Sequence, residues 1–125
     1  MNQRARPYRS VLYVPASNQR AMEKVKSLPV DAIIFDLEDA VSAGEKENAR
    51  QVLGEALKTG GFGSTMKIVR INELSTQWGV DDAKAVAKMD CDAVLLPKVE
   101  SAGHIDALRE ITGDLPIWAM METPL

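Results

Sequence analysis

Cysteine is nearly absent from the sequence, with one residue, Cys91, among 125. A single cysteine excludes a disulfide framework and a cysteine metal cluster within the chain. It fits a reducing compartment, so we expect a cytoplasmic protein. Long apolar runs are also missing, which predicts no membrane partner. The basic segment 1–7 has no apolar stretch behind it and does not predict a secretory signal.

The excess of one sign of charge over the other is also small. The net charge is -3 and no long basic run occurs, which argues against nucleic acid as the main partner. The hydrophobic share of 46% is that of a soluble globular protein, and the length suits one domain. We therefore expect a single globular unit with an ample apolar core.

Short apolar runs alternate with segments of helical periodicity along the whole chain. Near-continuous apolar strands alternating with helices are typical of a parallel sheet covered by helices, which is an α/β fold. The glycine-rich loop 59–64 should end the second helix, and Ser17 or Asn18 should cap the first. Strands are expected at 10–14, 32–36, 67–71, 93–96 and 115–121, and helices at 18–27, 43–58, 81–89 and 101–112.

Polar residues follow the predicted strands at the points where these end. In a parallel α/β sheet all carboxyl ends lie on one edge, where enzymes of this architecture place their sites. Charges gathered there cost desolvation free energy unless they pair or bind a ligand. The clusters are Asp36-Leu37-Glu38-Asp39, Arg70-Ile71-Asn72, Pro97-Lys98-Val99-Glu100 and Glu122-Thr123.

The acidic cluster and Arg70 each allow a structural and a functional interpretation. Asp36 and Asp39 can cap the next helix and accept backbone donors, or serve a site. Arg70 can form a structural ion pair with Glu38 and Asp39, or bind a substrate carboxylate through two contacts. It can also do both, because a paired and oriented guanidinium is well suited to carboxylates.

The remaining candidates also have two interpretations. Lys98 can pack at the sheet edge or form a Schiff base. Glu122, which ends an apolar strand, needs an arginine or a hard divalent cation. We expect His104 to be a surface helix residue, and Trp78 and Trp118 to serve packing rather than cofactor stacking.

Five ordered blocks of the sequence resemble one family. The blocks are 9–15, then 36–41 with Lys46 and 49–50, then 69–72 with Thr76 and Trp78, then 96–100, and finally 121–123. Taken together, they resemble the citrate lyase β-subunit-like (CitE-like) family of the HpcH/HpaI aldolase superfamily. One departure is Pro15-Ala16, where many members have Pro-Gly, and it matters little if φ is negative there.

The resemblance implies a fold, an activity and a cofactor. The fold is a TIM (β/α)8 barrel, of which residues 1–125 would be the N-terminal part, with about five strands and four helices. The activity is a Mg2+-dependent carbon–carbon lyase, or the reverse condensation, acting on citryl, citramalyl or malyl thioesters of coenzyme A or an acyl carrier protein. The products are an acyl thioester and a small 2-oxo acid. Family members commonly trimerise, so a homo-oligomer is expected.

The resemblance also carries residue roles. Glu122 matches a metal carboxylate, whose companion lies on the strand after those present here. Arg70 matches the substrate-binding arginine, and Glu38 and Asp39 would orient Arg70 or metal-bound water. The candidate catalytic residues are therefore Arg70, Glu38 and Asp39, the candidate substrate-binding residues are Arg70, Glu122 and Arg9, and the metal ligand is Glu122. Arg20 and Lys24 are further candidates for the thioester end.

Other protein classes fit the sequence less well. A response-regulator-like domain needs an acidic pair after the first strand and a phosphoacceptor aspartate after the third, where this chain has Pro15-Ala16 and Arg70. A dinucleotide-binding fold needs a glycine-rich loop after the first strand, and none follows it. A non-catalytic or regulatory homologue, or a Schiff-base aldolase that uses Lys98, stays open as an alternative.

Overall fold

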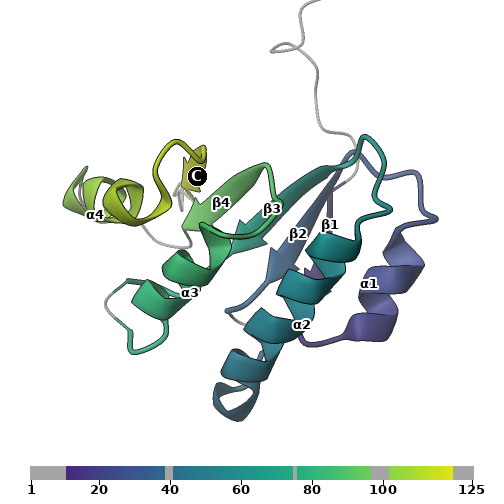
Figure 1. Ribbon diagram of the computed structural model, residues 1–125, viewed down its shortest axis with the longest axis horizontal. Helices are drawn as coiled ribbons and strands as arrows, with labels where there is room; N and C mark the ends of the chain where they lie inside the picture. Colours follow the sequence, from purple (N-terminus) through teal and green to yellow (C-terminus); the bar gives the residue numbers. More distant parts are fainter. Residues whose placement is uncertain (1–10, 39–40, 75, 97–101, 120–125) are drawn as a thin grey trace, which may run out of the picture.

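A computed structural model describes residues 11–38, 41–74, 76–96 and 102–119 of the chain. Strands and helices alternate throughout these residues, as Figure 1 shows. In chain order the elements are β1 (Val11–Pro15), α1 (Gln19–Val25), β2 (Ala32–Asp36), the 3-10 turn η2 (Ala43–Glu45), α2 (Lys46–Thr59), β3 (Met66–Arg70), α3 (Gly79–Val86), β4 (Ala93–Leu96), α4 (Ala102–Thr112) and β5 (Ile117–Ala119).

The strands form one parallel sheet in which neighbours in space are neighbours in sequence. The order is β1-β2-β3-β4-β5, and all adjacent pairs are parallel. Dinucleotide-binding folds use the order 3-2-1-4-5-6, and response-regulator-like folds use 2-1-3-4-5. The consecutive order confirms the predicted parallel α/β sheet and excludes both rival folds.

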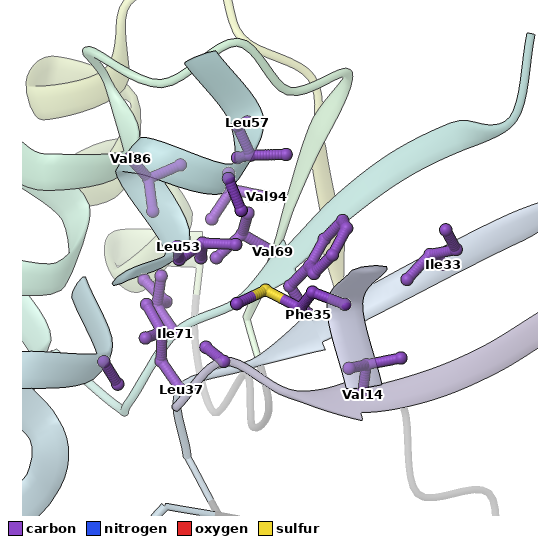
Figure 2. Close-up of a cluster of buried hydrophobic side chains, with 14 of the residues drawn as sticks. Val14, Ile33, Phe35, Leu37, Leu53, Leu57, Val69, Ile71, Val86 and Val94 are labelled. Carbon is purple, nitrogen blue, oxygen red and sulfur yellow. The ribbon is translucent and has the colours of Figure 1, made fainter. Parts of the chain in front are cut away.

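The helices cover a single face of this sheet. Because side chains alternate between the faces of a strand, Phe35, Val69 and Val94 pack toward helix residues such as Leu53 and Val86 (Figure 2). The opposite face carries a smaller apolar cluster, made by Ala32, Ile34, Ile68, Ala93 and Leu95 with Met66 and Trp118 packed against it. Apolar layers on both faces explain why the strands are continuous apolar runs. None of the helices in the described ranges combines the length and apolar character that a membrane crossing needs.

Helix boundaries differ from the predicted ones in physically simple ways. Asn18 is the cap of α1, because its side chain accepts a hydrogen bond from Ala21 N at 3.0 Å. The helix predicted from residue 43 begins as η2, where Glu45 N donates to Ser42 O over three residues, and continues as α2. α2 ends at Thr59 and is followed by the cap residue Gly60, whose φ of 74° favours glycine. The strand predicted to reach residue 121 is described as β5, and positions 120–121 lie outside the described residues.

Ala16 replaces a glycine without strain. Within the described ranges no residue other than glycine has a positive φ, so Ala16 has the negative φ on which its tolerance depends. Its side chain is fully buried in the core between the sheet and the helices. The condition under which this departure matters little, a negative φ at Ala16, is met.

Candidate active site

Asp36 and Arg70 form an ion pair at the carboxyl edge of the sheet. They end β2 and β3 and stand opposite each other in register. Arg70 Nε donates to Asp36 Oδ1 at 2.9 Å, and Nη2 donates to Oδ2 at 2.6 Å. Asp36 is 2% exposed and Arg70 8% exposed. Two parallel charge-assisted bonds therefore fix the plane of the guanidinium.

Two further groups surround the guanidinium of Arg70. Glu38 Oε1 lies 3.6 Å from Nη1, which is an ion pair in the longer range. The ring of Tyr13 on β1 lies with its centroid 5.4 Å from the central guanidinium carbon, within cation–π distance. The side chain of Arg70 thus reaches from β3 across β2 toward β1, over the face of the sheet that the helices leave uncovered.

The predicted ion pair between Arg70 and Glu38 is present, but the closest described contacts of Arg70 come from Asp36. Asp39, the other predicted partner, lies outside the described residues. The reason is register: Asp36 and Arg70 are the last residues of neighbouring parallel strands, while Glu38 lies two residues farther into the loop. Asp36 also does not cap the next helix, although its Oδ1 accepts one backbone donor, Glu38 N, at 2.8 Å.

Lys46 holds the loop that carries Glu38. Its ammonium donates to the carbonyl oxygens of Leu37, Glu38 and Val41 at 2.9, 2.8 and 3.0 Å. The same Nζ lies 5.1 Å from the ring centroid of Trp78. Only 5% of Lys46 is exposed, so a buried ammonium group holds the loop after β2 through three hydrogen bonds to its backbone. Sequence reasoning noted Lys46 as part of a matching block but assigned it no role.

Asn72 ties the same loop to the base of α3. Its side-chain amide donates to Leu37 O at 2.9 Å and to Asp82 Oδ2, and its backbone N donates to Asp82 Oδ2 at 2.9 Å. Asp82 is fully buried, and its other oxygen accepts from Arg50 Nε at 2.6 Å. Sequence reasoning placed Asp82 in a helix without a role, because nothing local marks a helix residue that bonds ten positions back.

Several candidate residues lie elsewhere or outside the described part of the chain. Arg20 and Lys24 are exposed on α1, and Lys24 lines a groove of about 270 Å3 between β1 and α1 with Leu12 and Leu28. Trp118 packs against the smaller apolar cluster, as predicted. Arg9, Asp39, Lys98, Glu100 and Glu122 fall outside the described residues. The described part of the chain contains no group of three or more His, Cys, Asp or Glu residues that could hold a metal ion.

Comparison with known proteins gives a consistent result. The family model described as HpcH/HpaI aldolase/citrate lyase matches residues 9–116. A (3S)-malyl-CoA thioesterase of Cereibacter sphaeroides is 50% identical over all of this chain and 44% of its own length. Citrate lyase subunit beta of Leuconostoc mesenteroides subsp. cremoris is 41% identical over 90% of this chain and 37% of its own length.

A solved structure agrees with these relatives. The citrate lyase beta subunit of M. tuberculosis, complexed with oxaloacetate and magnesium, superposes with a TM-score of 0.76 at 31% identity, over 98% of this chain and 51% of that one. The chain thus spans less than half the length of the curated relatives it matches.

The fold and the charged cluster define an α/β protein whose candidate site lies at the carboxyl edge of a parallel sheet. The chain belongs to the HpcH/HpaI aldolase/citrate lyase family, since the family model covers most of it. The relatives that match this chain are named as a thioesterase and as a lyase subunit, so the family is one of enzymes.

Proposed function

We propose that the protein of which these residues are part is a carbon–carbon lyase, or catalyses the reverse condensation, on a 3-hydroxyacyl thioester such as malyl-, citramalyl- or citryl-CoA. The products are an acyl thioester and a 2-oxo acid. The observation that carries this proposal is the Arg70 guanidinium, held in one plane at the carboxyl edge of the sheet. A guanidinium presented in this way suits a small carboxylate.

We further propose that the sheet closes into a (β/α)8 barrel, with residues 1–125 as the N-terminal part of that single domain. Consecutive strand order with helices on one face is the arrangement that a barrel requires. The outer edge also supports closure, because Val11, Leu12 and Tyr13 of β1 are 42%, 36% and 48% exposed. Exposed apolar edge strands invite aggregation, and closing the sheet into a barrel removes such edges.

The proposed carbon–carbon cleavage moves an electron pair from the 3-hydroxyl group to the thioester. A base removes the proton of the 3-hydroxyl group, the C–O bond becomes a carbonyl, and the bond between carbons 2 and 3 breaks. Its electron pair passes to the thioester as an enolate, which is then protonated to the acyl thioester. Arg70 holds the carboxylate beside the carbon that becomes the carbonyl and stabilises the developing negative charge on oxygen. Glu38, whose Oε1 lies 3.6 Å from Arg70 Nη1, and Asp39, which the resemblance adds, would keep Arg70 or a bound water oriented.

Magnesium is the metal that fits the donor chemistry of this edge. The side chains described there, Asp36 and Glu38, offer carboxylate oxygens rather than sulfur or imidazole, and Mg2+ prefers oxygen ligands. Both oxygens of Asp36 bond to Arg70. The family resemblance assigns the metal contact to Glu122, and we keep that assignment as a proposal. When bound, the metal would act as a Lewis acid on the 2-oxo acid.

A second candidate function is hydrolysis of the same thioester. The observation in its favour is the 50% identity to a (3S)-malyl-CoA thioesterase, against 41% to a citrate lyase beta subunit. The two reactions differ in the bond that breaks. Cleavage of the bond between carbons 2 and 3 of malyl-CoA yields glyoxylate and acetyl-CoA. Hydrolysis of the thioester bond consumes water and yields malate and free coenzyme A thiol.

The test uses the full-length protein with malyl-CoA and Mg2+. We expect glyoxylate and acetyl-CoA in equal amounts, measured by chromatography of both products, with the free thiol at background. Malate and free thiol without glyoxylate would assign the hydrolase function instead. Turnover without added metal, with a borohydride-trapped adduct at Lys98, would assign the Schiff-base mechanism.

The metal assignment is tested by Glu122→Gln. We expect Mg2+ affinity, measured by titration calorimetry, and turnover to fall together, because the substitution removes the charged oxygen donor. Glu110→Gln is the matched control, since Glu110 is exposed on α4. Wild-type Mg2+ dependence in the Glu122 variant would remove this residue from the metal site.

A further inference from the structure

Asp36 makes a set of contacts that no role named so far requires. Its two oxygens receive both bonds that fix Arg70, at 2.9 and 2.6 Å. Its Oδ1 also accepts the backbone N–H of Glu38 at 2.8 Å. One carboxylate therefore sets the plane of the guanidinium and the start of the loop that carries Glu38.

Stability alone is a weak reason for such a pair. Asp36 and Arg70 are both buried, and a buried ion pair is commonly no more stabilising than apolar side chains of similar volume. The same face of the sheet is otherwise filled by such side chains, Ile34 and Ile68 among them. A charged pair in that layer is better explained by a requirement for orientation.

The Tyr13 ring restricts the guanidinium in a second direction. Asp36 bonds along the edge of the guanidinium, while the ring lies 5.4 Å from its central carbon. The three residues come from three consecutive strands, β1, β2 and β3, so their relative positions are set by the sheet rather than by a loop. Sites supported by strands hold functional groups more precisely than sites supported by loops.

We propose that Asp36 is the positioning residue of this site, acting on the reaction through Arg70 and through the Glu38 loop. The inference rests on the proposed function, because it assumes that Arg70 contacts the substrate. Asp36 itself would touch neither the substrate nor the metal. Its removal should therefore change turnover through the orientation of Arg70 and should have no further effect once Arg70 is altered.

The experiment is a double-mutant cycle in the full-length protein with malyl-CoA. Asp36→Asn keeps the shape but removes the charge, and Arg70→Lys keeps the charge but removes the planar fork. We expect each to lower kcat/KM by about 100-fold, the scale of a lost transition-state contact. The double variant should be no worse than the poorer single variant, because both changes disable one unit.

The matched control is Asp92→Asn. Asp92 also joins two neighbouring strands through a carboxylate, accepting from Lys67 N at 2.8 Å, but at the amino edge of the sheet. We expect its kcat/KM to stay at the wild-type value. Asp36→Glu covers the case in which Asp36→Asn does not fold. It keeps the charge while shifting the carboxylate by one methylene group, and it should still lose kcat.

The possible outcomes separate this inference from the proposed function. Multiplicative losses in the cycle, or an Asp36→Glu protein with wild-type kcat, would overturn the positioning role. A wild-type Asp36→Asn beside an impaired Arg70→Lys would do the same while leaving the proposed function intact. An Arg70→Lys protein with wild-type kinetics would remove Arg70 from the mechanism and the positioning role of Asp36 with it, while the lyase function would stand on its products.

Discussion

The thiol of Cys91 lies where ionisation is unfavourable. Burial raises its pKa from 9.0 to about 11, and the neighbouring carboxylates of Asp92 and Asp90 add to the effect, while Lys67 opposes it. The fold thus favours the neutral thiol. Because the folded pKa lies above the unfolded one, this contribution to stability is present below pH 9 and is lost as the pH rises through about 11.

We expect Cys91 to react slowly with iodoacetamide in the native protein at pH 8. The thiolate is the reacting species, and its fraction should be roughly 100-fold smaller than in the unfolded chain. Mass mapping of the Cys91 peptide, with and without urea, measures the two rates. Equal rates would show that the native thiol ionises as an ordinary cysteine does, and Asp90→Asn should raise the native rate modestly.

At the scale of residues, the sequence identified Arg70 but not its main partner. Arg70 was identifiable because a charge that ends an apolar strand needs an explanation. Asp36 was visible for the same reason, but pairing the two requires the register of β2 against β3, which no local pattern encodes. Lys46 and Asp82 were harder still, since their bonds run to loop carbonyls and to Asn72.

At the scale of elements, the start of α3 depends on one glycine. A Cβ added to Gly79 would lie 2.0 Å from Glu73 O and 2.6 Å from Leu74 Cα. Both atoms belong to the backbone of the connection that follows β3, so they cannot move aside as a flexible side chain would. The connection and the helix are therefore in direct backbone contact at this point.

We expect Gly79→Ala to destabilise the protein by about 1–3 kcal/mol or more, because the new methyl group overpacks rigid backbone. Gly54→Ala is the matched control. Gly54 lies inside α2, where an added Cβ meets no atom within 4 Å. It should stabilise by about 0.5–1 kcal/mol, through the better helix propensity of alanine.

Urea unfolding of the two variants measures both free energies. A Gly79→Ala protein as stable as wild type would mean that the connection after β3 relaxes freely. A destabilised Gly54→Ala protein would mean that a partner occupies the space beside α2. The two glycines thus distinguish a helix start packed tightly against the connection after β3 from a helix surface with open space beside it.

Element types were more predictable than element ends. β2 and β4 begin and end at the predicted residues, 32–36 and 93–96. α3 was predicted two residues late at its start, because a glycine and a valine before Asp81 do not resemble a helix start. It was also predicted to extend to Met89, whereas Lys88 N and Met89 N make three-residue turn bonds to Ala85 O and Val86 O. Such tightening depends on packing that periodicity does not reveal.

At the scale of the whole molecule, the outer edge of β1 dominates the expected solution behaviour. Among the described residues β1 pairs with β2 alone, and its apolar side chains are exposed. A polypeptide limited to residues 1–125 should therefore associate through this edge and show no lyase activity. Size-exclusion chromatography with light scattering measures the association.

A charged edge provides the control for that prediction. Val11→Lys places a lysine on β1, a common protection of natural edge strands, and it should shift the segment toward smaller species. A monomeric, cooperatively unfolding segment without this substitution would contradict the prediction. Metal-dependent turnover by the segment would show that the site needs no residue beyond those in it.

The pairing of Asp36 with Arg70 also has a consequence for how the chain finds its fold. Sliding β3 by one residue along β2 would turn the Arg70 side chain toward the helices and leave Asp36 opposite an aliphatic residue. Two charges would then be buried without partners, and a misaligned sheet would be strongly penalised. The ion pair thus favours the correct register of β3 against β2. We expect the fraction of correctly folded protein to depend on it even when no substrate is present.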